Sequence, residues 1–246
     1  MTPAAILLAT AADPALAVQW TLAIALFLAI VHLVSPRLHS GLTGRDRLVC
    51  SLGGGMAASY VFLQLLPEVD RTHQPLGERV HAIMLAGFIA FYALERLVAV
   101  LSADHGRDTG WGAAVHFGSK FVYNGLIVYT MQENLPHGAA LAVLYSLALS
   151  FHLLYTDYHL AREHPREFHR WGRHLLAIAL VSGWLIAALT ELQPMSADIL
   201  LTLLCGSTLF EVFRHEIPDF KQSSLGWFCA GAGFYGALSI VVTRYG

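Results

Sequence analysis

Charged side chains are scarce in this sequence. Asp, Glu, Lys and Arg make up 13% of its 246 residues, whereas 56% of the residues are hydrophobic. A soluble domain carries roughly 25% charged residues and uses them to cover its water-facing surface. A soluble globular fold is therefore excluded, and membrane lipid is expected to be the partner of most of the surface. The net charge of −2 gives no sign of a nucleic-acid partner, and none is expected.

Cysteine and catalytic motifs are scarce as well. Cys50, Cys205 and Cys229 have no short spacing between them, so the sequence predicts neither a disulfide framework nor a zinc knuckle. It also contains no phosphate loop, dinucleotide fingerprint, nucleophile elbow or HExxH motif. The chain is therefore not expected to be an enzyme of a common soluble class.

Apolar residues instead gather into blocks. Each holds about 20 residues, which at a rise of about 1.5 Å per residue is enough to cross a hydrocarbon core of about 30 Å. The blocks are continuously apolar, unlike the alternating strands of a membrane barrel, so they predict helices. The sequence predicts an all-α polytopic membrane bundle of about eight transmembrane helices, forming a single domain over 1–246. The expected helices are 17–36, 46–66, 80–101, 114–131, 138–160, 174–192, 198–215 and 225–243.

Lysine and arginine lie mainly on one side of this predicted bundle. With the N-terminus outside, eleven of the 15 basic residues fall at inner helix ends and loops. Short loops rich in Lys and Arg stay on the cytoplasmic side. We therefore expect a multi-pass protein of the cytoplasmic (inner) membrane with both termini outside. The inner residues are Arg37, Arg45, Arg47, Arg96, Arg107, Arg162, Arg166, Arg170, Arg173, Arg214 and Lys221.

Glycine is concentrated in the second and last predicted helices. Small residues let membrane helices approach closely, because lipid removes any hydrophobic drive between them. The pattern therefore predicts tight helix packing, and an exposed glycine face would allow a homodimer. The residues concerned are Gly53, Gly54, Gly55, Gly226, Gly231, Gly233 and Gly236.

Polar side chains inside the fourth and fifth predicted helices are the clearest functional signal, because such groups need partners in lipid. Lys120 and Asn124 lie one turn apart on the fourth helix. His152 and Thr156 lie one turn apart on the fifth, and Asp157 follows. These five residues form the predicted central polar or transport site. Lys120 either snorkels to the inner interface or has a buried partner, for which Asp157 is the expected counter-charge. His152 is either a hydrogen-bonded core residue or, with Asp157, a metal ligand.

A run of histidines follows the fifth predicted helix. His159, His164, His169 and His174 are spaced by five residues. On one helix this spacing turns successive imidazoles by about 140°, which prevents the i, i+4 pair typical of metal-binding helices. The run is interpreted as a basic cytoplasmic belt near anionic headgroups. Convergence in an irregular loop is the alternative.

Acids near the inner helix ends are interpreted as anchors. Glu95 is followed by Arg96, an acid and base pair near the interface. Glu211 precedes Arg214 and His215 by three and four residues, a spacing that favours an interfacial ion pair.

Taken together, these segments resemble the ZIP (Zrt/Irt-like) family of divalent metal transporters over nearly the whole chain. The shared features are eight helices with both ends outside and a second helix that ends in Leu-Leu-Pro-Glu at 65–68. The third helix carries Phe-Tyr-Ala-Leu-Glu-Arg at 91–96, and 211–218 leads into a glycine-rich last helix. The likeness is to divergent bacterial ZIP-like membrane proteins, and it implies a ZIP-like fold.

The resemblance also implies where a metal would bind. Family members carry it on the fourth and fifth helices, in motifs of the form His-Asn-x-x-Asp/Glu-Gly and His-x-x-x-Glu. Here Lys120 replaces the first His, Phe121 replaces Asn, and Asn124 replaces the acid. The second motif keeps His152 but has Thr156 in place of Glu. An ammonium about 4 Å from a divalent ion costs on the order of 8 kcal/mol at an effective dielectric of about 20. The resemblance therefore implies that the usual divalent-metal site is altered or lost.

Several functions remain open at this point. The first is a ZIP-like, transporter-derived membrane protein with Lys120 at a ligand position, which carries another small solute or none. The second is a functional transporter of zinc or another divalent cation, with a shifted site around His152, Asp157 and Asn124. The third is an intramembrane metal-dependent hydrolase, which needs His116 and His152 to converge with Asp157. A purely structural or partner-binding role is the fourth. No cofactor is certain, and a divalent cation such as zinc is the one metal ligand considered.

Overall fold

The computed structural model describes residues 14–41, 46–104, 111–134, 139–190, 193–218, 221 and 223–245. Nearly all of these residues are helical, and none of them lies in a β-strand. The elements are α2 (Pro14–Gly41), α3 (Asp46–Tyr60), η1 (Val61–Leu65), α4 (Leu66–Leu76), α5 (Arg79–Asp104), α6 (Trp111–Asn134), α7 (Ala139–Glu163), α8 (Pro165–Glu167), η2 (Phe168–Gly172), α9 (Arg173–Leu189), α10 (Pro194–Glu211), η3 (Val212–Glu216) and α11 (Leu225–Tyr245). The prediction of an all-helical bundle is confirmed.

Within the described residues, six helices are long and apolar enough to cross a membrane. They cover Val18–Leu38, Arg47–Asp70, Arg79–Leu101, Pro165–Leu189, Pro194–Glu216 and Leu225–Val242. These six correspond to six of the predicted helices and fit a multi-pass membrane protein. The predicted helix 114–131 lies within α6, which has 24 residues, and the described part of the predicted helix 138–160 lies within α7, which has 25. Both helices carry buried polar side chains, among them Lys120 and Asp157.

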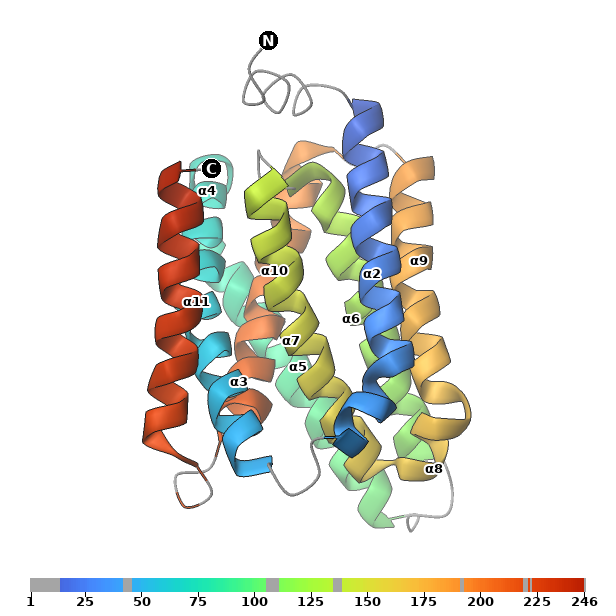
Figure 1. The fold of residues 1–246 in the computed structure, drawn as a ribbon. Helices are drawn as coiled ribbons and strands as arrows, with labels where there is room; N and C mark the ends of the chain where they lie inside the picture. The colour runs from blue at the N-terminus through green and yellow to red at the C-terminus, as the bar shows by residue number, and fades with distance from the viewer. Residues whose placement is uncertain are drawn as a thin grey trace.

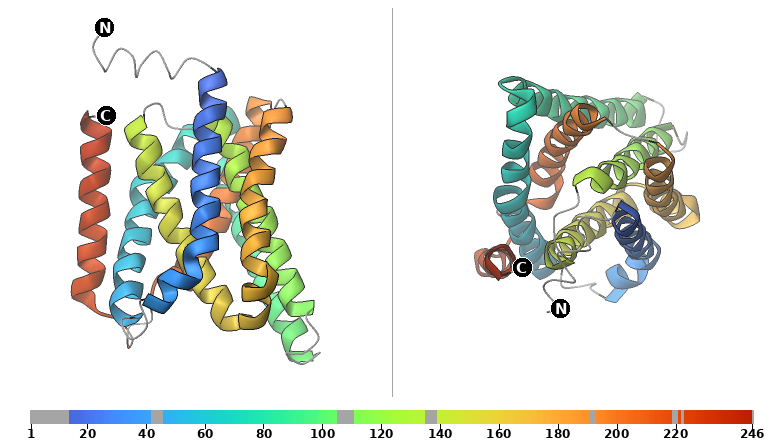
Figure 2. Two further views of the ribbon diagram at one scale, coloured as in Figure 1. Left: turned by 45° about the vertical axis from the view of Figure 1, so that its right-hand side comes forward. Right: turned by 90° about the horizontal axis from the view of Figure 1, so that it is seen from above.

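The polarity of α6 and α7 is explained by their place in the bundle. α6 packs against α2, α5, α9 and α10, and the view along the bundle shows these helices around it (Figure 2). Between Ala142 and Ala161 of α7, Val143 is the one residue that is exposed. Polar side chains on such covered helices can face protein instead of lipid.

The helices run alternately up and down the bundle. In Figure 1, α2 begins and α11 ends at the same end of the molecule. The opposite end holds the start of α6, the turn from α7 into α8, and the transition from α10 into η3 (Figure 1). Segments far apart in the sequence therefore meet at this second end.

The second predicted helix extends well past the end predicted for it. The helix expected at 46–66 passes through the π-helical turn η1 and continues to Leu76. In η1 the N–H of Leu66 bonds to the carbonyl of Val61, five residues back. Pro67 lies just after this π-helical turn, and the helix continues through it as α4. The prediction that Pro67 ends the helix is therefore wrong.

Glycines let three pairs of helices touch backbone to backbone. A Cβ added at Gly55 or Gly231 would collide with the backbone of the partner helix in the α3–α11 pair. The same holds for Gly87 and Gly206 in the α5–α10 pair and for Gly183 of α9 against α6. Close backbone approach of this kind is how small residues associate membrane helices. The glycine packing predicted for the second and last helices is thus found at Gly55 and Gly231.

This packing predicts opposite effects for two glycines on α11. Gly231→Ala should lower the free energy of unfolding by about 1–3 kcal/mol, because the added methyl group overpacks the contact with α3. Gly233→Ala is the matched control, since nothing lies within 4 Å of a Cβ there. Alanine is the better helix former, so the control should be neutral or stabilising by up to about 1 kcal/mol. Unfolding in detergent micelles measures the stability of both variants. Equal losses of stability in the two would contradict the close crossing of α3 and α11.

Candidate functional site

A first polar network joins α2, α6 and α7 inside the bundle. The Nδ1 atom of His32 lies 2.8 Å from Oδ1 of Asp157. The amide nitrogen of Asn124 donates to Nε2 of His32 over 3.0 Å. All three side chains are fully buried. Because Nε2 accepts, the proton of a neutral imidazole is on Nδ1 and is donated to the Asp157 carboxylate.

A proline in α2 contributes to this network. Pro36 has no backbone N–H, so the carbonyl of His32, four residues earlier, loses its helical donor. The hydroxyl of Ser35 donates to that carbonyl instead, over 3.0 Å. The backbone around His32 therefore stays satisfied although a proline lies inside the helix.

Lys120 is the centre of a second network. Its side chain is 3% exposed, so it does not snorkel to the interface. The ammonium nitrogen lies 2.5 Å from Oε2 of Glu211 on α10 and 3.9 Å from Oε1 of Glu95 on α5. The expected partner, Asp157, is instead taken by His32. The prediction of a Lys120–Asp157 pair is wrong because helix spacing fixes the face of a side chain but not the helix that covers this face.

Glu211 is buried and Glu95 is partly buried, and neither is a simple interfacial anchor. Glu211 is 2% exposed, while Arg214 one turn later is exposed. Glu95 approaches Nε2 of His215 at 3.7 Å and Nε2 of His116 at 3.3 Å. One donor atom from each of Glu95, Glu211 and His215 lies within 4.8 Å of the other two. The two acids therefore form a site with the chemistry of a cation ligand set, and Lys120 lies against it.

His152 belongs to a third network. Its Nδ1 atom forms a short contact with Oε1 of Glu216 in η3, and its Nε2 atom lies 3.1 Å from the hydroxyl of Tyr123. That hydroxyl also contacts Thr208 at 2.7 Å. Thr156 is buried one turn further along α7. His152 is thus a hydrogen-bonded core residue, and its partners do not include Asp157.

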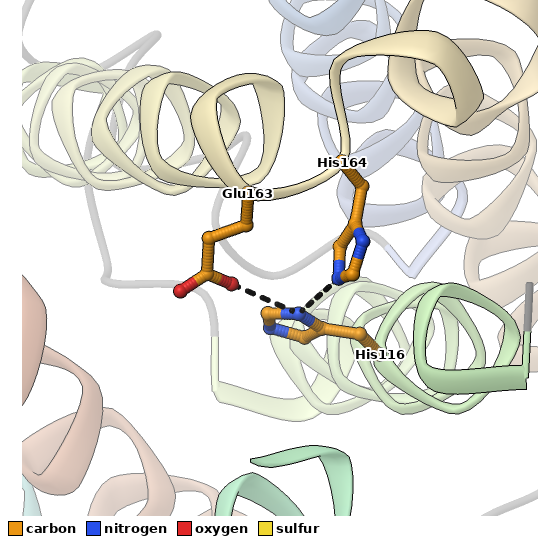
Figure 3. A group of neighbouring side chains, drawn as sticks. All are labelled: His116, Glu163 and His164. Atoms are coloured by element: carbon orange, nitrogen blue, oxygen red, sulfur yellow. Dashed lines mark hydrogen bonds and ion pairs between the residues drawn. The ribbon is translucent and has the colours of Figure 1, made fainter. Parts of the chain in front are cut away.

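A fourth group lies where α7 turns into α8, and Figure 3 shows it. The Nδ1 atom of His116 is 3.3 Å from Oε2 of Glu163 and 3.4 Å from Nε2 of His164. The second carboxylate oxygen of Glu163 lies 3.0 Å from Nε2 of His159. The three side chains come from the first turns of α6 and from the end of α7, and they point toward one another (Figure 3).

His164 converges with His116 because the histidine run does not lie on one helix. Pro165 follows His164, and a proline disfavours the helical conformation of the residue before it. His164 accordingly has φ −129° and ψ 63°, and α7 ends at Glu163. The five-residue spacing therefore sets no angle between His159 and His164. His169 and His174 are exposed and fit the interpretation as a basic belt, whereas His164 does not.

The environment of His164 favours its neutral form. Burial lowers the pKa of His164 below its usual value, and the neighbouring His116 lowers it further. A neutral imidazole presents one unprotonated nitrogen, which is the form that binds a metal.

The five residues predicted for the central site are all buried, but they divide between separate networks. Asn124 and Asp157 contact His32, Lys120 contacts the two acids, and His152 contacts Glu216. His116 and His152 also take different partners, so the arrangement that an intramembrane hydrolase needs is not found among the contacts of the described residues.

The first network makes a prediction about stability. Asp157→Ala should lower the free energy of unfolding by about 1–3 kcal/mol, because the buried Nδ1–H of His32 loses its acceptor. Asp157→Asn keeps an acceptor and should lose less. Asp70→Ala on the exposed side of α4 is the control and should change stability by less than about 0.5 kcal/mol. Chemical unfolding in detergent measures the series, and a neutral Asp157→Ala would contradict the pair.

No family model matches this chain, and no curated protein matches it at a significant level. The likeness to the ZIP family therefore rests on the sequence motifs alone.

Proposed function

We propose that this chain is a ZIP-like, transporter-derived integral membrane protein in which Lys120 occupies the place of a divalent cation. The observation that carries the proposal is the contact of its buried ammonium with Glu211 at 2.5 Å and with Glu95 at 3.9 Å. Glu95, Glu211 and His215 are together a set of donors that can hold a metal ion. The ammonium of Lys120, which comes from α6, neutralises this set. The usual metal path is thereby altered or lost.

We also propose that eight helices cross the membrane, with α6 and α7 added to the six apolar ones. α6 and α7 are as long as the six apolar helices, and their polar faces are covered by protein. They would cross the membrane inside the bundle, where lipid does not contact their buried side chains. The excess of Lys and Arg at one end favours a cytoplasmic membrane with both termini outside.

The acids that contact Lys120 still have the chemistry to bind a metal ion. Among the described residues, Oε1 of Glu211 has no hydrogen-bond partner. Taking a carboxylate out of water requires a compensating charge, and the ammonium supplies it. A divalent ion at the same place would be repelled by the ammonium and would have to displace it. Lys120 and a bound metal ion are therefore alternative occupants of one site.

This alternative occupancy predicts a gain of metal binding on removal of the charge. Lys120→Gln should bind one divalent cation per chain beyond whatever the wild type holds, because Glu95, Glu211 and His215 become free to ligate it. Elemental analysis and zinc titration of the detergent-purified protein measure the number bound. Lys221→Gln, which removes the exposed lysine after η3, is the control and should leave the number unchanged. Equal numbers in Lys120→Gln and the wild type would contradict the proposal.

A functional transporter with a shifted site around His152 is the second candidate. It is favoured by a small cavity that His152 and Glu216 line together with Tyr60 and Tyr235. Zinc uptake into proteoliposomes separates the two functions. Under our proposal the wild type shows no uptake above empty vesicles. Uptake that is lost in His152→Ala would establish the transporter and overturn the proposal.

A further inference from the structure

We propose that His116, Glu163 and His164 form an exchangeable site for Zn²⁺ or a similar divalent metal where α7 turns into α8. Its three ligands are different residues from the acids that hold Lys120, although Glu95 contacts both Lys120 and His116. The site requires neither transport nor a ZIP-like origin. Two imidazoles and one carboxylate are the ligand types that zinc prefers in three-ligand sites.

Two of the three pairs of donor atoms have the spacing that zinc needs. His116 Nδ1 lies 3.3 Å from Oε2 of Glu163 and 3.4 Å from Nε2 of His164, and all three atoms lie within 4.8 Å of one another. Ligands at about 2.0–2.1 Å from a tetrahedral ion are separated by about 3.4 Å. Figure 3 shows both contacts meeting at the Nδ1 atom of His116. An ion between the three atoms would therefore need little movement of the side chains.

Two of the three ligands also make a contact through the atom that does not face the other ligands. The second nitrogen of His116 faces Oε1 of Glu95 at 3.3 Å, and the second oxygen of Glu163 faces Nε2 of His159 at 3.0 Å. A histidine ligand that contacts a carboxylate through its other nitrogen is the usual arrangement in zinc proteins. Nε2 of His116 faces Glu95 at ion-pair distance without a hydrogen bond, and Nδ1 is the atom that faces the other two ligands.

The backbone around the site is rigid. Pro165 sets the turn that brings His164 back toward α6. Next to it Phe117, Leu160 and Phe168 form a small apolar core and are fully buried. Phe117 follows His116 in the chain and packs so closely on Gly172 that a Cβ there would collide with its ring. Ligands held on packed elements of this kind are preorganised.

The three ligand side chains differ in their exposure to solvent. His116 is 1% exposed, His164 is half-buried, and the side chain of Glu163 is 39% exposed. Three protein ligands with one open side leave a coordination position for water, as in sites where the metal is accessible. We therefore infer a metal that exchanges with solvent, not a closed structural ion.

Cobalt and zinc binding to the complete, chelator-stripped protein in detergent tests this site. The wild type should bind one Zn²⁺ per chain, and Co²⁺ should give the visible absorption of a tetrahedral complex. Glu163→Gln and His164→Ala should each weaken binding at least about 100-fold, since each removes a ligand. His159→Ala removes only an outer contact and should weaken binding about 10- to 100-fold. His169→Ala, an exposed histidine of the same run, is the matched control and should bind like the wild type.

Two results would overturn the inference. One is a folded wild type that binds neither ion, and the other is unchanged affinity in both Glu163→Gln and His164→Ala. X-ray absorption of zinc bound to the wild type gives a readout that needs no variant, and it should report two imidazole ligands. The additional ion expected in Lys120→Gln should persist in the Lys120→Gln, His164→Ala double variant. The two sites can therefore fail separately.

Discussion

The charge of Lys120 sets the strongest constraint on this structure. An ammonium in the interior of a bundle that faces lipid loses its hydration, and at an effective dielectric of about 20 an opposite charge at about 4 Å returns only about 4 kcal/mol. A second acid or a shorter contact is needed, and Lys120 has both, with Glu211 at 2.5 Å and Glu95 at 3.9 Å. These acids lie on α10 and α5, so the pairing of one side chain requires three helices to meet.

The packing of the bundle meets this requirement. α5 and α10 touch backbone to backbone at Gly87 and Gly206, and α9 approaches α6 just as closely at Gly183. Close crossings of this kind keep the carboxylates within reach of the lysine. Glu95 in turn contacts His116, which contacts Glu163 and His164 at the end of the bundle. Ionisable side chains thus run continuously from the buried lysine to the half-exposed turn between α7 and α8.

The helices could be predicted from the sequence because a helix that faces lipid appears as a continuous block of apolar residues. Each apolar block became a helix, and Gly55 of the second block and Gly231 of the last lie at a helix crossing. The position of Lys120 inside an otherwise apolar segment could be seen in the sequence, but the sequence left open whether the lysine reaches the interface or is buried. Its partners could not be predicted, because the period of a helix says which residues share a face and nothing about the neighbouring helix. His32, Glu95 and Glu211 look like ordinary polar residues near helix ends until the fold covers them.

The group at the α7–α8 turn was missed for a different reason. A spacing of five residues excludes a metal pair only if the helix continues, and Pro165 ends it. The proline was visible in the sequence and is the signal that could have separated His164 from the rest of the histidine run. His116 carried no such signal, since a single histidine in an apolar helix is more often a core residue.

A double-mutant cycle on Lys120 and Glu211 tests the central claim most directly. Unfolding free energies would be measured in detergent for Lys120→Met, Glu211→Gln and the combination of the two. Each single variant leaves one buried charge without its closest partner and should lose about 3–5 kcal/mol. The double variant should lose less than the sum by about 2 kcal/mol or more. Losses that simply add would show that the two residues do not interact and would contradict this account of the bundle.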